Sequence, residues 1–153
     1  MTRNTTALSA WSTDTGLLLI RVMLGVVFLY HGWDKLANAG IDGFAGYLDS
    51  LGVPLPMLNA WMAVAAEIIG GLALVLGVGV RFAAVPLTIT MLVAAFVAHG
   101  GAFDVRNNGM EYPLTLAVIS AALIFLGAGR LTVIPVLRRF RTPSTSTSAA
   151  ATA

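Results

Sequence analysis

Four apolar stretches divide the chain, separated by short polar segments and by segments rich in glycine and proline. They cover roughly residues 15–30, 57–76, 82–98 and 113–126. Each one reaches, or with its flanks comes close to, the roughly 20 residues that a helix needs to cross a bilayer. The pattern therefore predicts an all-α fold, an integral membrane four-helix bundle within residues 15–137.

The segment between the first two stretches, residues 31–56, has a pattern of its own. Apolar residues recur in it at helical spacing, namely at Ile41, Phe44, Ala45, Leu48 and Leu51. Asp42 and Asp49 fall on other faces of such a helix. We expect a short amphipathic helix that lies on the membrane interface in the first outer loop. The alternative is an irregular polar loop.

The ends of the apolar stretches resemble one another in pairs. The first stretch leads to His31-Gly32 and the third to His99-Gly100, while the second ends in LGVGVR and the fourth in LGAGR. This repetition favours two helical hairpins in tandem. Glycine-rich ends are also common in membrane chains by chance, so the sequence leaves the duplication open.

The two ends of the chain differ from this central domain. Residues 1–14 are polar and lack the pattern of a cleaved signal peptide, so the first apolar stretch is expected to stay as a helix. Residues 138–153 are first basic and then of low complexity, which predicts a disordered tail. Basic residues expected on the cytoplasmic side are Arg3, Arg81, Arg130, Arg138, Arg139 and Arg141, against Lys35 and Arg106 outside. Both termini are therefore expected in the cytoplasm.

Composition supports the membrane assignment and narrows the chemistry. Of the 153 residues, 58% are hydrophobic and 10% charged, and the mean hydropathy is +0.86. A net charge of +2 is too small to indicate nucleic-acid binding. The chain has no cysteine, which excludes disulfides, cysteine-ligated zinc, iron–sulfur clusters and thiol chemistry on this chain.

Polar residues in or beside the apolar stretches are the candidates for function. They are Arg21, His31, Glu67, His99 and Glu111. Ionisable groups at membrane depth are costly and normally face the bundle interior with a partner. Helical geometry places Arg21, Glu67 and His99 on stripes that include small residues, so we expect these stripes to face one another.

Glu67, near the middle of the second stretch, has two interpretations. It could form a structural ion pair with Arg21 that fixes the helix register. It could instead be a proton-handling carboxyl group whose charge is set by Arg21. The general expectation for an ionisable group within the membrane favours function.

The two histidines would lie at similar depth near the outer ends of their helices. They could cap helix ends, exchange protons with a bound quinone or another redox headgroup, or ligate one haem, although nothing else in the sequence points to haem. A metal site of two histidines and one or two glutamates has acceptable ligands but no recognisable spacing. Glu111 could simply stabilise the start of the fourth helix.

Several motifs in this order resemble the DoxX family of small four-helix bacterial membrane proteins. They are HGWDK at 31–35, AEIIGGLALVLGVGVR at 66–81 and NNGMEYP at 107–113, together with Arg21 and His99. The resemblance covers roughly residues 16–130. It implies a bacterial inner-membrane protein with a link to quinones or oxidative stress. The residues on the family's polar pattern are Arg21, His31, Lys35, Glu67, His99 and Glu111.

The main functional hypothesis is a quinone-interacting component of a membrane oxidoreductase, with a polar pocket that opens toward the outer half of the membrane. The expected catalytic residues are Glu67, His31, His99 and Arg21, and the expected quinone-binding residues are His31, Lys35, His99 and Glu111. An alternative is a non-catalytic scaffold that recruits a soluble redox partner. A small-solute transporter is a third hypothesis, which would require a homo-oligomer.

Overall fold

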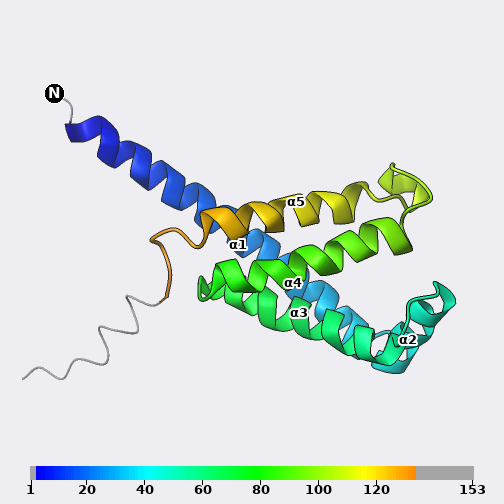
Figure 1. The fold of residues 1–153 in the computed structure, drawn as a ribbon. Helices are drawn as coiled ribbons and strands as arrows, with labels where there is room; N and C mark the ends of the chain where they lie inside the picture. Colours follow the sequence, from blue (N-terminus) through cyan, green and yellow to red (C-terminus); the bar gives the residue numbers. More distant parts are fainter. Residues whose placement is uncertain (1–2, 134–153) are drawn as a thin grey trace, which may run out of the picture.

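The computed structural model describes residues 3–133, and all regular structure in this range is helical. The helices form an elongated bundle (Figure 1), and the predicted fold class is confirmed. Their bounds are α1 Arg3–Ala37, α2 Ile41–Ser50, α3 Pro56–Leu76, α4 Val80–Val93, the π-helical turn η1 Ala94–Ala98, the 3-10 turn η2 Val105–Asn107 and α5 Glu111–Leu126. The tail predicted at 138–153 lies outside the described residues.

Helix α1 begins at Arg3, so most of the segment expected to precede it is helical. Asp14, from this segment, is buried at the end of the bundle opposite to α2, which we call the inner end. Its carboxylate accepts hydrogen bonds from the backbone N–H of Arg130 at 2.9 Å and from the Arg130 Nε at 2.7 Å. This contact with the loop after α5 explains why the polar start of α1 belongs to the folded unit.

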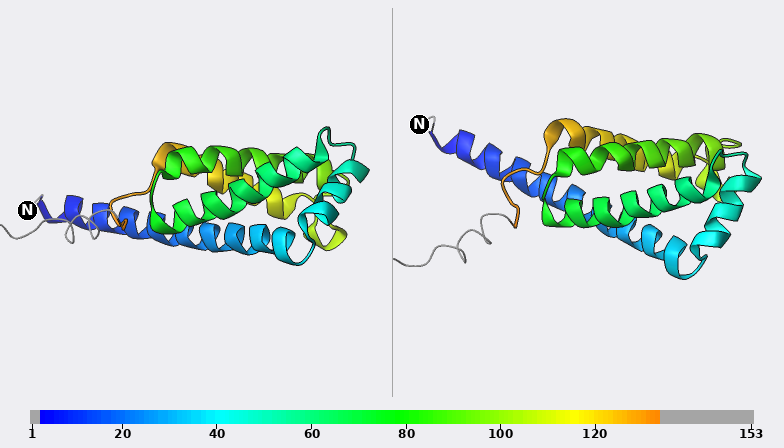
Figure 2. Two further views of the ribbon diagram at one scale, coloured as in Figure 1. Left: turned by 90° about the horizontal axis from the view of Figure 1, so that it is seen from below. Right: turned by 60° about the horizontal axis from the view of Figure 1, so that its bottom comes forward.

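The bundle consists of two helix pairs, α1 with α3 and α4 with α5, which the α3–α4 contact joins. Figure 2 shows the pairs side by side along the long axis. α1 and α3 approach very closely, because a Cβ atom on Gly25 would lie 2.7 Å from the backbone oxygen of Gly71. Small residues on facing stripes allow such approach between membrane helices, as the sequence predicts for α1 and α3.

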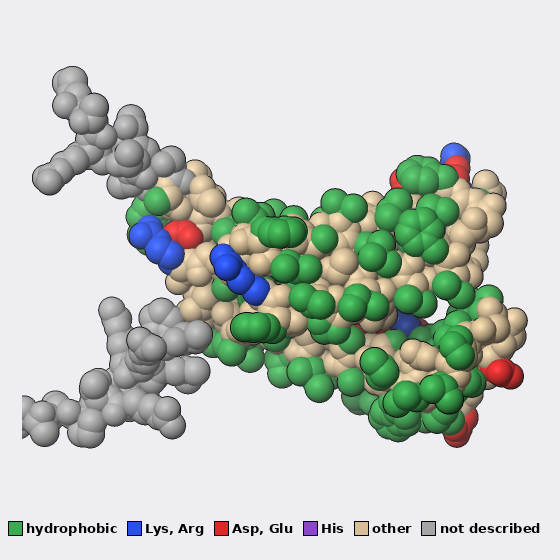
Figure 3. Space-filling view, in the orientation of Figure 1, with side chains coloured by type: hydrophobic (Ala, Val, Ile, Leu, Met, Phe, Trp, Pro, Cys, Tyr) green, Lys and Arg blue, Asp and Glu red, His purple; other side chains and the backbone are tan. Residues whose placement is uncertain are grey.

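Three helical segments are long and apolar enough to cross a membrane. They are Ala10–Ala37, Pro56–Leu76 and Val80–Ala98, with 28, 21 and 19 residues. α5, with 16 residues, is apolar but shorter. The space-filling view in Figure 3 shows hydrophobic side chains over the middle of the molecule, with charged side chains mostly toward its two ends. The chain is therefore a membrane protein whose helices lie in a lipid bilayer.

α2 confirms the predicted short amphipathic helix between the first two apolar stretches, and we call the end of the bundle where it lies the outer end. Its Ala45 and Leu48 are buried against Ala60 of α3, and Phe44 packs at the border of this cluster. Gly40, which precedes the helix, has φ of 70°, a left-handed conformation that favours glycine. α2 thus lies across the outer end of α3 (Figure 1).

Candidate functional site

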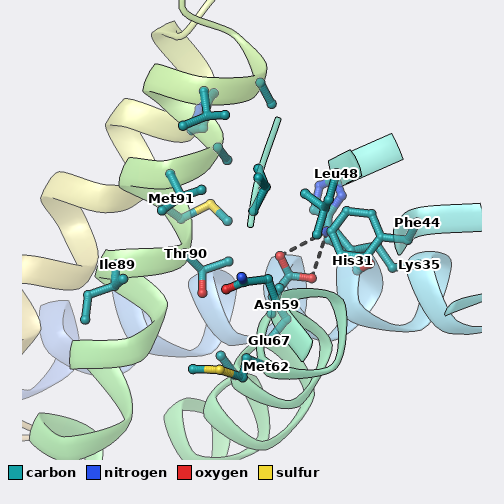
Figure 4. Close-up of a pocket in the computed structure, with 18 of the residues that line it drawn as sticks. His31, Lys35, Phe44, Leu48, Asn59, Met62, Glu67, Ile89, Thr90 and Met91 are labelled. Atoms are coloured by element: carbon teal, nitrogen blue, oxygen red, sulfur yellow. Dashed lines mark hydrogen bonds and ion pairs between the residues drawn. The ribbon is translucent and has the colours of Figure 1, made fainter. Parts of the chain in front are cut away.

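A cavity of about 400 Å³ opens at the outer end of the bundle, between the two helix pairs. Its walls come from α1, α2, α3, α4, η1 and α5, and most of its lining is aliphatic or aromatic. Figure 4 shows side chains from several of these helices converging on it. Ligand sites in proteins have this character, an apolar pocket with a few polar groups at fixed places. The predicted site residues that line it are His31, Lys35, Glu67 and His99.

The strongest polar feature of the cavity is an ion pair between α1 and α3. The Lys35 Nζ donates to both carboxylate oxygens of Glu67, at 2.8 and 3.0 Å (Figure 4). The Glu67 side chain is 0% exposed and that of Lys35 is 24% exposed. Gly32, one turn before Lys35, permits the close approach, since a Cβ there would lie 3.0 Å from the Glu67 Cβ. The Lys35 ammonium also lies 5.5 Å from the centre of the Phe44 ring, a cation–π contact with α2.

Arg21 does not contact Glu67, so the sequence-based interpretation that Arg21 sets the charge of this carboxyl group is corrected. Arg21 is 1% exposed and lies at the inner end. Its Nη1 donates to the carbonyls of Leu74 and Val75 at 2.8 and 2.9 Å, and its Nη2 donates to the carbonyl of Leu131. A cation is favourable at the carboxyl end of a helix, where carbonyls lack intrahelical partners. Arg21 therefore joins the end of α3 to the segment after α5.

His31 connects the two helix pairs at the cavity. Its Nε2 lies 3.3 Å from the hydroxyl oxygen of Tyr112 on α5, a hydrogen bond between α1 and α5. His31 is half-buried and Tyr112 is exposed. Because few contacts join α1 and α5, this hydrogen bond is a distinct link between the pairs at their outer ends.

His99 follows the π-helical turn η1 on the opposite wall. Its backbone N–H donates to the carbonyl of Ala94 at 3.1 Å, and its Nδ1 lies 3.0 Å from the same oxygen. Since a carbonyl only accepts, the Nδ1 carries a proton and donates to this oxygen. Turns of this kind occur often at functional sites, but the sequence AAFVA gives no indication of one.

Glu111 lies away from the cavity lining. It is exposed at the start of α5, and its Oε2 accepts a hydrogen bond from the backbone N–H of Val105 at 3.2 Å. In the same outer loop, hydrogen bonds from the Arg106 side chain and backbone N–H lower the pKa of Asp104 below its usual range. These contacts order the loop before α5.

Sequence reasoning missed several polar and aromatic residues of the cavity. They are Asn59, Thr90, Tyr112 and the aromatic residues Phe28 and Phe44. Tyr112 stands beside Glu111 in the NNGMEYP motif, and of the two it is Tyr112 that lines the cavity. Within residues 3–133, no group of three or more His, Cys, Asp or Glu side chains is arranged to hold a metal ion.

The sequence profile of a family described as DoxX matches residues 16–100, which include His31, Lys35, Glu67 and His99. No solved structure matches the chain.

Curated relatives extend the match. The chain is 32% identical over 112 residues to the Bacillus subtilis protein named "Putative oxidoreductase CatD". The aligned region covers 73% of this chain and 81% of that relative. It is 32% identical over 132 residues to an uncharacterized Haemophilus influenzae protein, covering 83% and 86% of the two chains. It is 36% identical over 83 residues to "Inner membrane protein YphA" of Escherichia coli, covering 54% and 58%.

Proposed function

Because the chain belongs to the DoxX family, we propose that it is a bacterial inner-membrane protein that binds a quinone in its outer-end cavity. It would act as the quinone-interacting component of a membrane oxidoreductase system. The names of the B. subtilis and E. coli relatives, one an oxidoreductase and the other an inner-membrane protein, support this proposal. In the proposed topology α5 is the fourth span, and both termini lie in the cytoplasm, as the distribution of basic residues favours.

The observation that carries the proposal is an apolar cavity with a buried ion pair at one end. Phe28, Met91 and Leu116 are buried and line it. A ring with two carbonyl oxygens suits such a site, because the Lys35 ammonium can donate to one oxygen while apolar side chains contact the ring. Glu67 supplies an acceptor for the hydroxyl group of the reduced form.

The chemistry expected of these residues is proton handling. A bound quinone supplies a carbonyl-to-hydroxyl redox couple whose reduction consumes protons. Glu67 can hold or release a proton next to Lys35, and His31, near the outer surface with Tyr112, can exchange protons with water. The His99 imidazole, which also lines the cavity, is a further candidate for proton exchange with the quinone. Arg21 takes no part, because it is buried at the inner end.

Electrons would come from a partner subunit, soluble or membrane-bound. The chain contains no cysteine for thiol chemistry, so sulfur chemistry coupled to this quinone would also need a partner. Reconstitution with such a partner should yield quinone turnover that Glu67→Gln abolishes without loss of folded protein. Unchanged turnover in Glu67→Gln would contradict the proton-handling role.

The direct test is equilibrium binding of a tail-less methylated benzoquinone to the purified protein in mild detergent. We expect saturable binding that weakens by about tenfold or more in Lys35→Met/Glu67→Leu, since a hydrogen bond to a charged group contributes about 1.5–3 kcal/mol. Asp49→Asn, on the exposed face of α2, is the control and should bind normally. Absence of saturable binding in the wild-type protein would refute the proposal, and a stoichiometric co-purifying partner would then favour a scaffold.

A further inference from the structure

The cavity has two kinds of wall, one closed and one open. At the closed side, Glu67, Phe28 and Met91 are 0%, 1% and 7% exposed. At the open side, Met62 of α3 and Ile89 of α4 also line the cavity, yet they are 60% and 57% exposed. A side chain that both lines a cavity and reaches the surface marks an opening. The cavity therefore opens sideways between α3 and α4.

The course of α3 and α4 explains this opening. The two helices are joined by the short turn at Gly77–Gly79 and diverge toward the outer end (Figure 1). Near the turn they are in tight contact, because a Cβ atom on Gly70 would lie 2.9 Å from the Leu87 side chain. Farther out, α3 presents the small residues Ala63 and Ala66 to the cavity. The gap is thus closed at the turn and open toward η1.

The space-filling view shows the same opening from outside. Figure 3, in the orientation of Figure 1, shows a hollow between the outer ends of α4 and of the α2–α3 region, with a basic side chain inside it. Green side chains surround the hollow. An apolar rim with a charge at the floor suits a ligand that has a small polar head and an apolar chain.

The position of the opening indicates the medium from which a ligand arrives. Met62 and Ile89 belong to Pro56–Leu76 and Val80–Ala98, the segments long and apolar enough to span a membrane. Side chains exposed on such segments face lipid. A ligand that passes between α3 and α4 therefore comes from the bilayer, whereas a water-soluble ligand would have to pass the outer end.

We propose that the gap between Met62 and Ile89 is a lateral portal through which a membrane-resident ligand reaches the cavity and through which its apolar chain remains in the lipid. The substrate class is a long-chain lipid quinone, with the ring beside Lys35 and Glu67. A cavity of about 400 Å³ is at the small end of the range of ligand pockets, roughly 300–1,000 Å³. It suits a ring with a short part of the chain, so a longer chain must leave it. This inference rests on the proposed quinone site.

The absence of cysteine from the chain allows a site-specific test. Single variants Ile89→Cys and Val118→Cys are labelled with a fluorophore and placed in lipid nanodiscs. Val118, on α5, is 63% exposed and does not line the cavity, so it is the matched lipid-facing control. The probe is a benzoquinone whose alkyl chain carries a nitroxide quencher, added at low mole fraction.

We expect stronger quenching at position 89 than at position 118, and loss of this excess when a tail-less benzoquinone is added to occupy the ring site. Met62→Cys, on the other side of the portal, gives the same readout if Ile89→Cys does not fold. Equal quenching at 89 and 118 overturns the portal, as does an excess that the tail-less ring does not remove. Equilibrium dialysis of the tail-less ring separates the two proposals: if it binds and the quenching is equal, only the portal fails; if it does not bind, the quinone site fails.

Discussion

Replacing Lys35 by methionine should destabilise the protein, because it breaks a buried ion pair. The substitution removes the cation that donates to both Glu67 oxygens at 2.8 and 3.0 Å. Among the described residues, no other side chain bonds this carboxylate. The Glu67 side chain is 0% exposed, so water cannot replace the lost partner without local opening.

The size of this loss of stability can be estimated from how far the side chains of Lys35 and Glu67 are buried. Removing one partner of a buried ion pair costs about 3–5 kcal/mol. Because the Lys35 side chain is 24% exposed, solvent already screens part of the interaction, and we expect the lower limit, about 3 kcal/mol. At about 3–4 °C per kcal/mol for a domain of this size, the Tm should fall by about 10 °C.

A double-mutant cycle measures this effect without ambiguity. Thermal unfolding in mild detergent is followed for wild type, Lys35→Met, Glu67→Leu and the double variant. Apolar replacement of both partners is close to neutral in buried pairs, so the double variant should recover most of the lost stability. It should not recover quinone binding. A Lys35→Met variant within about 1 °C of wild type, or a double variant as unstable as the sum of the two single changes, would refute the reasoning.

Three further predictions concern other parts of the fold. Gly71→Ala should lower the stability of the protein, because the added Cβ would lie 2.9 Å from a backbone oxygen of α1. Gly16→Ala has nothing within 4 Å of the added Cβ and should raise the stability by up to about 1 kcal/mol in the same unfolding assay. Arg21→Met should lower the stability by about 2–4 kcal/mol, because the variant loses the hydrogen bonds of Arg21 to three carbonyls. The affinity for the tail-less quinone should stay unchanged, and weaker binding would contradict the separation of Arg21 from the cavity. The protection of the Arg106 amide against hydrogen exchange, measured as the ratio of the intrinsic to the observed rate, should fall as the pH falls below the usual aspartate pKa and through the lowered pKa of Asp104. Asp104→Asn should abolish this pH dependence of the protection.

The fold could be predicted from the sequence, because apolar stretches and their glycine or proline boundaries determine where helices form in a membrane. The predicted start and end of α3 and α5 agree closely with the structure, and the α2 pattern located a real amphipathic helix. The start of α1 was placed too late, because the polarity of its first residues hid the contact between Asp14 and Arg130, residues far apart in the sequence.

The candidate site could be predicted from the sequence only in part. Lys35, His31, Glu67 and His99 were identified and do line one cavity, but the partner of Glu67 was wrong. Arg21 and Lys35 lie on the same face of α1, so helical periodicity cannot choose between them. The choice depends on how far α1 slides along α3, which is set by close contacts such as that of Gly32 with Glu67. Composition and spacing do not encode that offset.

The ion pair has a consequence for how ligand binding in the cavity depends on the membrane potential. A single charge moved across the full membrane potential changes its energy by about 2.3 kcal/mol per 100 mV. Lys35 and Glu67 together carry no net charge, and they move as one unit because their atoms are in contact. Occupation of the cavity by a neutral ligand that keeps the pair intact therefore transfers no charge through the electric field. The affinity of the cavity for such a neutral ligand should therefore be the same in energised and de-energised membranes.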